Sequence, residues 1–419
     1  MRRCFPKCAG VCGVWRMLIL AVLWLASQVG AGDIVASAAD GSLWNLPLKE
    51  LVIADDALFH RAKYSMVDAD TLRLRGGDGA LLCAGLDTGD IVMQLTEDHA
   101  HVFLVSTTFY NKGDDGVRDK AQFESLLSSG VESISACLNT AAKQRKTDRR
   151  ETGVRARAWE WTTPNCAVLL EASSSGSGKR YVAEFIRLII APNKEALERG
   201  GAADGARKDE LKDNVSVTED GSVIITGVPM VDQGEKGYCV PAAVARVFAY
   251  YGMNGVDQHA LAALCKSSGR GTTLPDMEKA LVSISAPFHM IVTSWEWISP
   301  KYLSKIYTRK SQKMREDSPE TLMKIFEDNP ALMQKGFASI RKYIDQGIPV
   351  IWGVILGIFP EKGIPQSIGG HMRLIIGYNE KNQTLFYTDS WGVGHELKSM
   401  PLTQACPITR FLGVLRPRR

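Results

Sequence analysis

The sequence predicts an α+β protein with two domains, on three observations. Residues 101–110 are rich in Val, Thr, Phe and Tyr and give the strongest strand signal in the sequence. Residues 240–251 are apolar on most faces and stop at Gly252, as a buried helix does. Residues 193–221 are rich in Ala, Gly and charged side chains, which predicts a linker. A chain of 419 residues with 45% hydrophobic and 23% charged residues has the length and composition of two globular domains.

Residues 1–31 have the pattern of a signal peptide. Basic residues are followed by the apolar run 17–26, and Val29-Gly30-Ala31 fits a small-x-small cleavage site. The uncharged run 17–32 is short for a membrane-spanning helix. We therefore expect export to the periplasm or medium without a stable membrane anchor. An uncleaved anchor is the alternative, and Met17 is an alternative start.

The basic charge of the chain lies mostly in this segment. Residues 1–31 hold four of the 50 Lys and Arg residues and none of the 46 Asp and Glu residues, which leaves 46 of each sign. A chain with no net positive charge has no electrostatic basis for binding nucleic acid, so we expect no nucleic-acid partner. The sequence does not indicate an oligomeric state.

Six cysteines remain beyond the signal peptide: Cys83, Cys137, Cys166, Cys239, Cys265 and Cys406. An exported protein can form disulfides, and one pair is conceivable here. The spacing does not identify the partners, and buried free thiols are the alternative.

The first domain, residues 32–192, is predicted to be α+β and holds no catalytic constellation. We expect a short segment at 42–48, helices at 120–128 and 131–143, and strands within 70–83, 91–94, 101–110, 154–161, 167–171 and 180–191. Core packing is the expected role of Trp44, Trp159 and Trp161, with a ligand-binding stripe as the alternative. A removable pro-region is an open possibility for this domain.

The second domain, residues 222–419, is predicted to alternate helices and strands. We expect helices at 240–251, 256–265, 274–283 and 338–346, and strands at 222–229, 349–356, 372–378, 384–388 and 407–416. The charged, mostly helical stretch 300–335 is expected to form a lid or to pack outside the core.

Cys239 stands at the start of the predicted helix 240–251. The first backbone N–H groups of a helix lack partners, and the helix dipole is positive there, so a thiolate is favoured over a thiol. This position suits a nucleophile. Gln233, six residues upstream, lies beside Gly234 in a predicted turn, where its amide can contribute to an oxyanion hole.

Two further groups come late in the chain. His371 opens the apolar strand 372–378, and Asp389 follows the strand 384–388. We expect these two strands to pair, which favours His371 over its rival His395, a residue in the loop after Gly392. Neither a CxxC partner for Cys239 nor an HExxH sequence occurs, so no metal and no cofactor is expected.

The order Gln233, Cys239, His371, Asp389 resembles that of papain-like thiol hydrolases. The stretch Val228-Pro229-Met230-Val231-Asp232-Gln233-Gly234-Glu235-Lys236-Gly237-Tyr238-Cys239 is most similar to the cysteine region of bacterial C39-like peptidases. The resemblance covers about residues 224–415. The chain departs from papain in having Tyr238 and Val240 around the cysteine and an aspartate, Asp389, in place of an asparagine.

The resemblance implies a papain-like fold, with a helical half that carries Cys239 and an antiparallel sheet that carries His371 and Asp389. It also implies a Cys-His-Asp triad with Gln233 in the oxyanion hole, and Trp391 shielding the His–Asp hydrogen bond. The implied function is an exported cysteine peptidase that acts on peptides or proteins. The alternatives are an isopeptidase, amidase or transferase acting on cell-wall or other amides, and a non-catalytic peptide-binding module.

Overall fold

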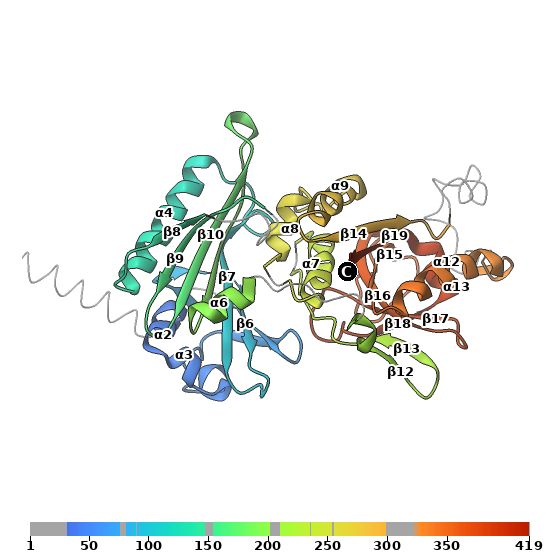
Figure 1. Cartoon of the computed structure of the whole chain (residues 1–419), viewed down its shortest axis with the longest axis horizontal. Coiled ribbons are helices and arrows are strands. Elements are labelled where there is room, and N and C mark those ends of the chain that lie inside the picture. The colour runs from blue at the N-terminus through green and yellow to red at the C-terminus, as the bar shows by residue number, and fades with distance from the viewer. Residues whose placement is uncertain are drawn as a thin grey trace, which may run out of the picture.

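The computed structural model describes residues 32–75, 81–88, 90–146, 154–201, 210–234, 236–253, 255–298, 323–324 and 326–418. The predicted signal peptide 1–31 and most of the predicted insertion 300–335 lie outside the described residues. Helices and antiparallel sheets form two lobes side by side, here called the N-terminal lobe (32–201) and the C-terminal lobe (210–418) (Figure 1). The predicted α+β class is confirmed.

The N-terminal lobe is built on one eight-stranded antiparallel sheet. Its buried face meets the core around Leu72, Val105 and Leu188, each with no exposed surface. In spatial order the strands are β2 (Lys63–Met66), β3 (Thr71–Arg75), β6 (Asp90–Leu95), β7 (Val102–Asn111), β11 (Val182–Ala191), β10 (Ala167–Ser175), β9 (Arg157–Thr162) and β8 (Lys143–Lys146). A small sheet joins β1 (Gly32–Asp33), β4 (Leu81–Cys83) and β5 (Leu86–Asp87).

One long helix, α4 (Lys120–Cys137), replaces the two helices predicted at 120–128 and 131–143. A capping box at Asp119 and Gln122 fixes its start. Gly130 lies within this helix and faces Phe109 and Leu170, so packing against the sheet carries the helix through it. The lobe also has α2 (Ile34–Asp40), α3 (Ser42–Asn45), η1 (Lys49–Ile53), η2 (Gly178–Arg180) and α6 (Lys194–Gly201).

The C-terminal lobe has a second antiparallel sheet. Its main path runs through β12 (Val215–Val217), β13 (Ser222–Ile225), β16 (Gly369–Asn379), β15 (Val350–Leu356), β19 (Thr409–Pro417) and β14 (Met290–Trp295). The strand β17 (Thr384–Thr388) pairs with β16 and with β18 (Lys398–Pro401). The predicted pairing of the strand that follows His371 with the strand that precedes Asp389 is confirmed, since Leu374 lies opposite Thr388.

Helices of this lobe pack on the sheet and toward the N-terminal lobe. They are α7 (Cys239–Tyr250), α8 (Gln258–Leu264), α9 (Leu274–Ser285), α12 (Pro330–Ile344) and α13 (Leu402–Ile408). Helix α12 begins eight residues before the predicted start, at Pro330, a residue suited to the first turn. The predicted last strand 407–416 is wrong at its start, because Pro407 lies inside α13.

The predicted linker 193–221 is wrong where the structure describes it. Helix α6 buries Leu197 against the first sheet, and η3 (Glu210–Asn214) buries Leu211 in the core of the second lobe. Strand β12 then pairs with β13, so the second sheet starts within the predicted linker. A few apolar residues at buried positions are therefore enough to order these short elements.

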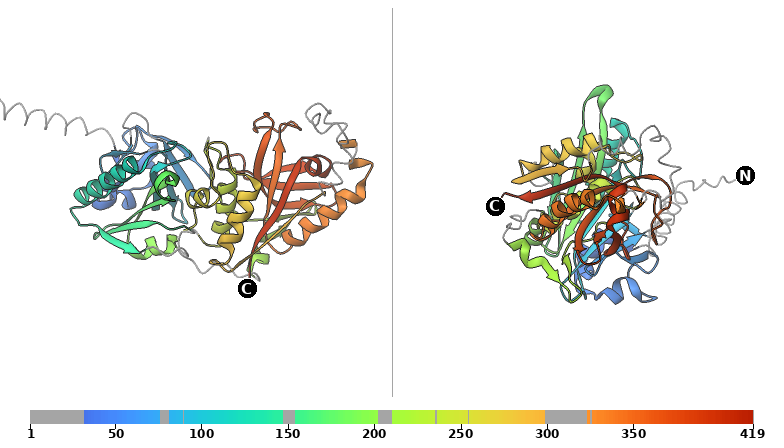
Figure 2. Two further views of the ribbon diagram at one scale, coloured as in Figure 1. Left: turned by 90° about the horizontal axis from the view of Figure 1, so that it is seen from above. Right: turned by 90° about the vertical axis from the view of Figure 1, so that its right-hand side faces the viewer.

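The two lobes meet through helix α8, which lies between the two large sheets (Figure 1 and the left view of Figure 2). Arg187 of β11 is buried between Glu171 of its own lobe, at 2.6 Å, and Asp257, the N-cap of α8, at 2.5 Å. Phe185 and Ala260 form a small apolar contact beside this ion pair. The interface therefore combines a buried charge network with apolar packing.

Among the described residues, no helix is both long and apolar enough to cross a bilayer.

Arg187→Met is expected to lower the free energy of unfolding by about 3–5 kcal/mol, because it leaves the buried Glu171 carboxylate without its cation. Urea denaturation followed by circular dichroism measures the change. Arg180→Met, at an exposed arginine of η2, is the control and should change stability by about 0.5 kcal/mol or less. Equal midpoints for the two variants would contradict the assigned role of Arg187.

Candidate active site

Cys239 is the first residue of helix α7. The preceding residue, Tyr238, makes no side-chain cap, so the first turn is not closed by a neighbouring side chain. Pro241 lies in this first turn, where the missing N–H of proline costs no helical hydrogen bond. The side chain of Cys239 is partly buried and lies close enough to the imidazole of His371 to raise the pKa of that histidine. The sequence therefore places a thiol at a helix N-terminus and beside an imidazole, the surroundings in which a cysteine nucleophile is found.

His371 lies near the start of β16 and is hydrogen-bonded to Asp389. Its Nε2 is 2.5 Å from Asp389 Oδ1, and Asp389 has no exposed surface. Burial alone would lower the pKa of His371, but the Asp389 carboxylate and Cys239 outweigh it and raise that pKa to about 9. Nε2 is taken by the carboxylate, which leaves Nδ1 for the thiol. A thiol, an imidazole and a carboxylate in this order are able to form a thiolate–imidazolium pair.

Arg373 is a member of the site that the sequence reasoning missed. Its Nε donates to Asp389 Oδ2 at 2.9 Å, and its other end pairs with Glu361 at 2.9 Å. Burial would raise the pKa of Asp389, but His371 and then Arg373 hold it below its usual range. The signal was available: in a strand, residues 371 and 373 share a face, and Arg373 is the one charged residue of an apolar run.

Trp391 lies flat on the imidazole of His371. The two rings are stacked, with centroids 4.2 Å apart and an interplanar angle of 2°. The indole thus covers one face of the histidine that bonds to Asp389. The ring of the rival His395 packs edge-on against the indole of Trp391, with the ring centroids 5.7 Å apart. The backbone carbonyl of His395, and not its ring, accepts a hydrogen bond from the Asp389 N–H.

Gln233 lies in the loop before α7 and is held by the turn after β17. Its backbone N–H donates to the Ser390 carbonyl at 2.8 Å, and its Oε1 accepts from the Ser390 hydroxyl at 2.7 Å. Its Nε2 donates to the Lys236 carbonyl at 3.3 Å. These partners fix the orientation of the amide, because a carbonyl only accepts. One N–H of the amide remains for a further acceptor.

Arg246 joins the parts of the site from within the core. It follows Cys239 by seven residues on α7, is 1% exposed, and donates to the backbone carbonyls of Pro229 and Asp389, both at 2.7 Å. Its third contact is Thr388 Oγ1 at 2.5 Å. The nucleophile helix, the Gln233 loop and the end of β17 are therefore fixed to one guanidinium. A lone arginine in an apolar helix was the sequence signal for it.

The other five described cysteines are free thiols, and their burial opposes ionisation of the thiol. Burial raises the pKa of Cys137 to about 11 and that of Cys265 to about 12. Burial also raises the pKa values of Cys83, Cys166 and Cys406. The conceivable disulfide is absent among the described cysteines.

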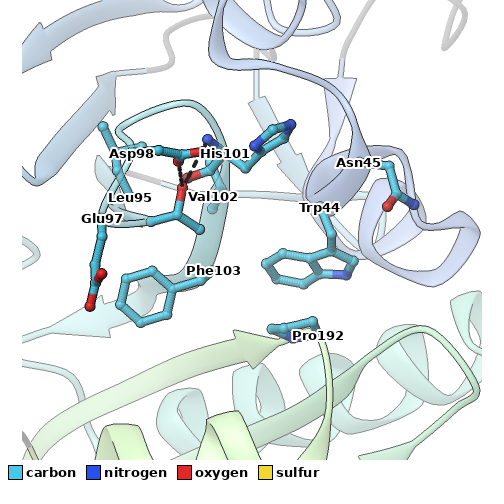
Figure 3. A pocket seen from close by; sticks show the side chains of 10 residues that line it. Trp44, Asn45, Leu95, Glu97, Asp98, His101, Val102, Phe103 and Pro192 are labelled. Carbon is cyan, nitrogen blue, oxygen red and sulfur yellow. Dashed lines mark hydrogen bonds between the residues drawn. The ribbon is translucent and has the colours of Figure 1, made fainter.

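Core packing, the expected role of the tryptophans, is confirmed, because Trp161 lies in the core of the N-terminal lobe and Trp44 and Trp159 pack against that core. Trp161 is 1% exposed and bonds to Ser135, while Trp44 lines a separate hollow of about 840 Å³ with Phe103 and Pro192 (Figure 3). All residues around this hollow belong to the N-terminal lobe. Within the described residues, no group of three or more His, Cys, Asp or Glu side chains is placed to hold a metal ion.

Comparison with known proteins gives a family for the part of the chain that holds this site. Residues 225–406 match the Peptidase_C39 like family. The solved structure of xylellain, a cysteine protease from Xylella fastidiosa, is similar at 13% identity and a TM-score of 0.26, over 50% of this chain and 89% of its own. No curated protein matches the chain.

Iodoacetamide at pH 6 is expected to label Cys239 ahead of the other cysteines, because Cys239 lies beside a histidine that can act as its base while burial raises the pKa values of the others. His371→Ala should slow this labelling about tenfold or more, because it removes the base that activates the thiol. Peptide mass spectrometry measures the rate at each cysteine.

His60→Ala, a histidine change in the N-terminal lobe, is the control and should leave the labelling rate unchanged. Unselective labelling that neither substitution alters would contradict an activated Cys239–His371 pair.

Proposed function

From the match of residues 225–406 to the Peptidase_C39 like family, we propose that this chain is an exported cysteine peptidase that hydrolyses peptide amide bonds. The observation that carries the proposal is the buried hydrogen bond of His371 with Asp389 beside Cys239, at the junction of α7 and the second sheet. We further propose peptides or proteins as its substrates. The family and the site support the same chemistry from independent directions.

In the first step, the Cys239 thiolate attacks the carbonyl carbon of the scissile amide. A C–S bond forms and the carbonyl oxygen becomes an oxyanion, which accepts hydrogen bonds from the Cys239 backbone N–H and the free N–H of Gln233. Ser390 fixes the Gln233 amide for this purpose. The intermediate collapses as the C–N bond breaks and the His371 imidazolium gives its proton to the departing amine.

In the second step, neutral His371 takes a proton from water, which attacks the thioester and releases the acid and the Cys239 thiolate. Asp389 holds the imidazole in place through Nε2 and stabilises its positive charge. Arg373 and the Ser390 N–H in turn orient the carboxylate, at 2.9 Å each. Trp391 covers the imidazole face and keeps water from the His371–Asp389 hydrogen bond.

Hydrolysis of a quenched fluorescent peptide library tests this function. Wild type should cleave a subset of peptides and Cys239→Ser should cleave none. The rate on the best peptide should fall as the pH rises through about 9, because His371 then loses the proton that the leaving amine requires. Asp389→Asn removes the charge that raises the pKa of His371, so this alkaline limb should move toward about 6.5.

Selective labelling of Cys239 without hydrolysis of any peptide would contradict a peptidase. An alkaline limb that stays in place in Asp389→Asn would contradict the assigned role of the carboxylate.

The export part of the proposal rests on the signal-like residues 1–31. Expression in a bacterial host should give a soluble periplasmic or secreted form whose intact mass corresponds to a start at residue 32. Replacing part of the apolar run 17–26 with charged residues is the control and should retain the full-length chain in the cytoplasm. A membrane-bound chain that keeps residues 1–31 would contradict cleavage.

A further inference from the structure

The loop that carries Gln233 is held from the N-terminal lobe on both sides of the glutamine. This loop, residues 230–234 and 236–238, here called the glutamine loop, forms neither helix nor strand. The Met230 N–H donates to Asp68 Oδ2 at 3.1 Å, and the Lys236 ammonium donates to Asp114 Oδ2 at 2.7 Å. A segment without its own backbone ladder depends on such contacts for a single conformation.

Arg73 makes the central contact, directly beside Gln233. From strand β3 of the first sheet, its guanidinium donates to Asp232 Oδ2 at 2.7 Å and to the Asp232 backbone carbonyl at 3.3 Å. Arg73 is 6% exposed, and two-point contact of a guanidinium fixes both position and orientation. The other carboxylate oxygen, Asp232 Oδ1, accepts from the Gly234 N–H at 2.7 Å. Strand β3 therefore sets the position of both residues that flank Gln233: Asp232 directly, and Gly234 through Asp232.

The end of the loop next to Cys239 is also held by the N-terminal lobe. The ring of Tyr238, 1% exposed, packs against the backbone of Gly113. A Cβ at Gly113 would lie 2.7 Å from the Tyr238 ring, so the glycine leaves room for the residue that precedes the nucleophile.

Much of the space between the lobes beside this loop is open. A cavity of about 1170 Å³ is lined by β3, by β6 and by the glutamine loop, including Arg73, Asp90, Asp232 and Lys236. On this side the loop is restrained by discrete polar contacts across the gap, and less by close packing. When one such contact is lost, the loop is free to move into the cavity.

We propose that the N-terminal lobe sets the position of the oxyanion hole, with Arg73 as the positioning residue that acts through Asp232 on Gln233. This inference rests on the proposed peptidase function. It assigns the first domain a part in the active enzyme, and it predicts that this lobe is retained in the active form and is not a pro-region removed on activation.

The test compares Arg73→Met with Arg75→Met, a change on the same strand at an arginine that is 50% exposed and pairs with Asp90. Arg73→Met should lower kcat on the best library peptide about tenfold or more, while KM changes less. The loss is bounded by Gln233→Ala, expected at about 10²–10³-fold for one oxyanion donor. Alkylation of Cys239 by iodoacetamide, which needs no oxyanion hole, should keep its wild-type rate. Arg75→Met should match wild type in all three readouts.

A double-mutant cycle separates positioning from general damage. In a Gln233→Ala background, Arg73→Met should cost less than twofold in kcat, because the donor that it positions is gone. Asp114→Asn is a milder second variant, at a side chain that is 46% exposed, and it should repeat the pattern if Arg73→Met does not fold. An equal loss in both backgrounds, no loss, or a parallel loss of Cys239 alkylation would overturn the proposal.

Hydrogen exchange of the peptide that spans residues 230–238 tests the anchoring without catalysis. Arg73→Met should raise its exchange rate above that of wild type and of Arg75→Met, and unchanged exchange would overturn the proposal. A wild-type enzyme that cleaves no peptide, with the exchange difference present, would reject the proposed function and retain the anchoring of the loop.

Discussion

The C-terminal lobe is organised around one buried negative charge, the carboxylate of Asp389. A carboxylate with no exposed surface is costly unless it is paired and hydrogen-bonded, and both of its oxygens meet a cation, His371 on Oδ1 and Arg373 on Oδ2. These partners lie two residues apart on β16, so the pleat of one strand supplies both. The charge of the site, the orientation of its imidazole and the register of β16 against β17 are therefore set together.

The sequence predicted the parts of the site that depend on local structure. Cys239 at a helix start and His371 at the head of an apolar strand each follow from a short pattern, and both elements exist. The pairing of β16 with β17, also predicted, brings Asp389 to His371. The order of these residues carried the family prediction, and residues 225–406 match the Peptidase_C39 like family.

The remaining parts depend on contacts between distant segments, which no local pattern encodes. Arg246 was visible as a charge in an apolar helix, but its acceptors, the carbonyls of Pro229 and Asp389, are set by the tertiary fold. The ion pair of Arg73 with Asp232 joins residues of different lobes, 159 positions apart. The ordered elements within the predicted linker were missed for a related reason: composition describes an average, whereas a single buried Leu197 or Leu211 decides whether a short segment is held.

The stacking of Trp391 on His371 gives the molecule an optical reporter of its own charge state. An imidazolium quenches indole fluorescence by accepting an electron from the excited ring, and neutral imidazole does so far less. With centroids 4.2 Å apart and nearly parallel planes, Trp391 is in range for such transfer. The difference in emission between wild type and Trp391→Phe thus follows the protonation of a single side chain, even with nine tryptophans in the sequence and without any substrate or dye.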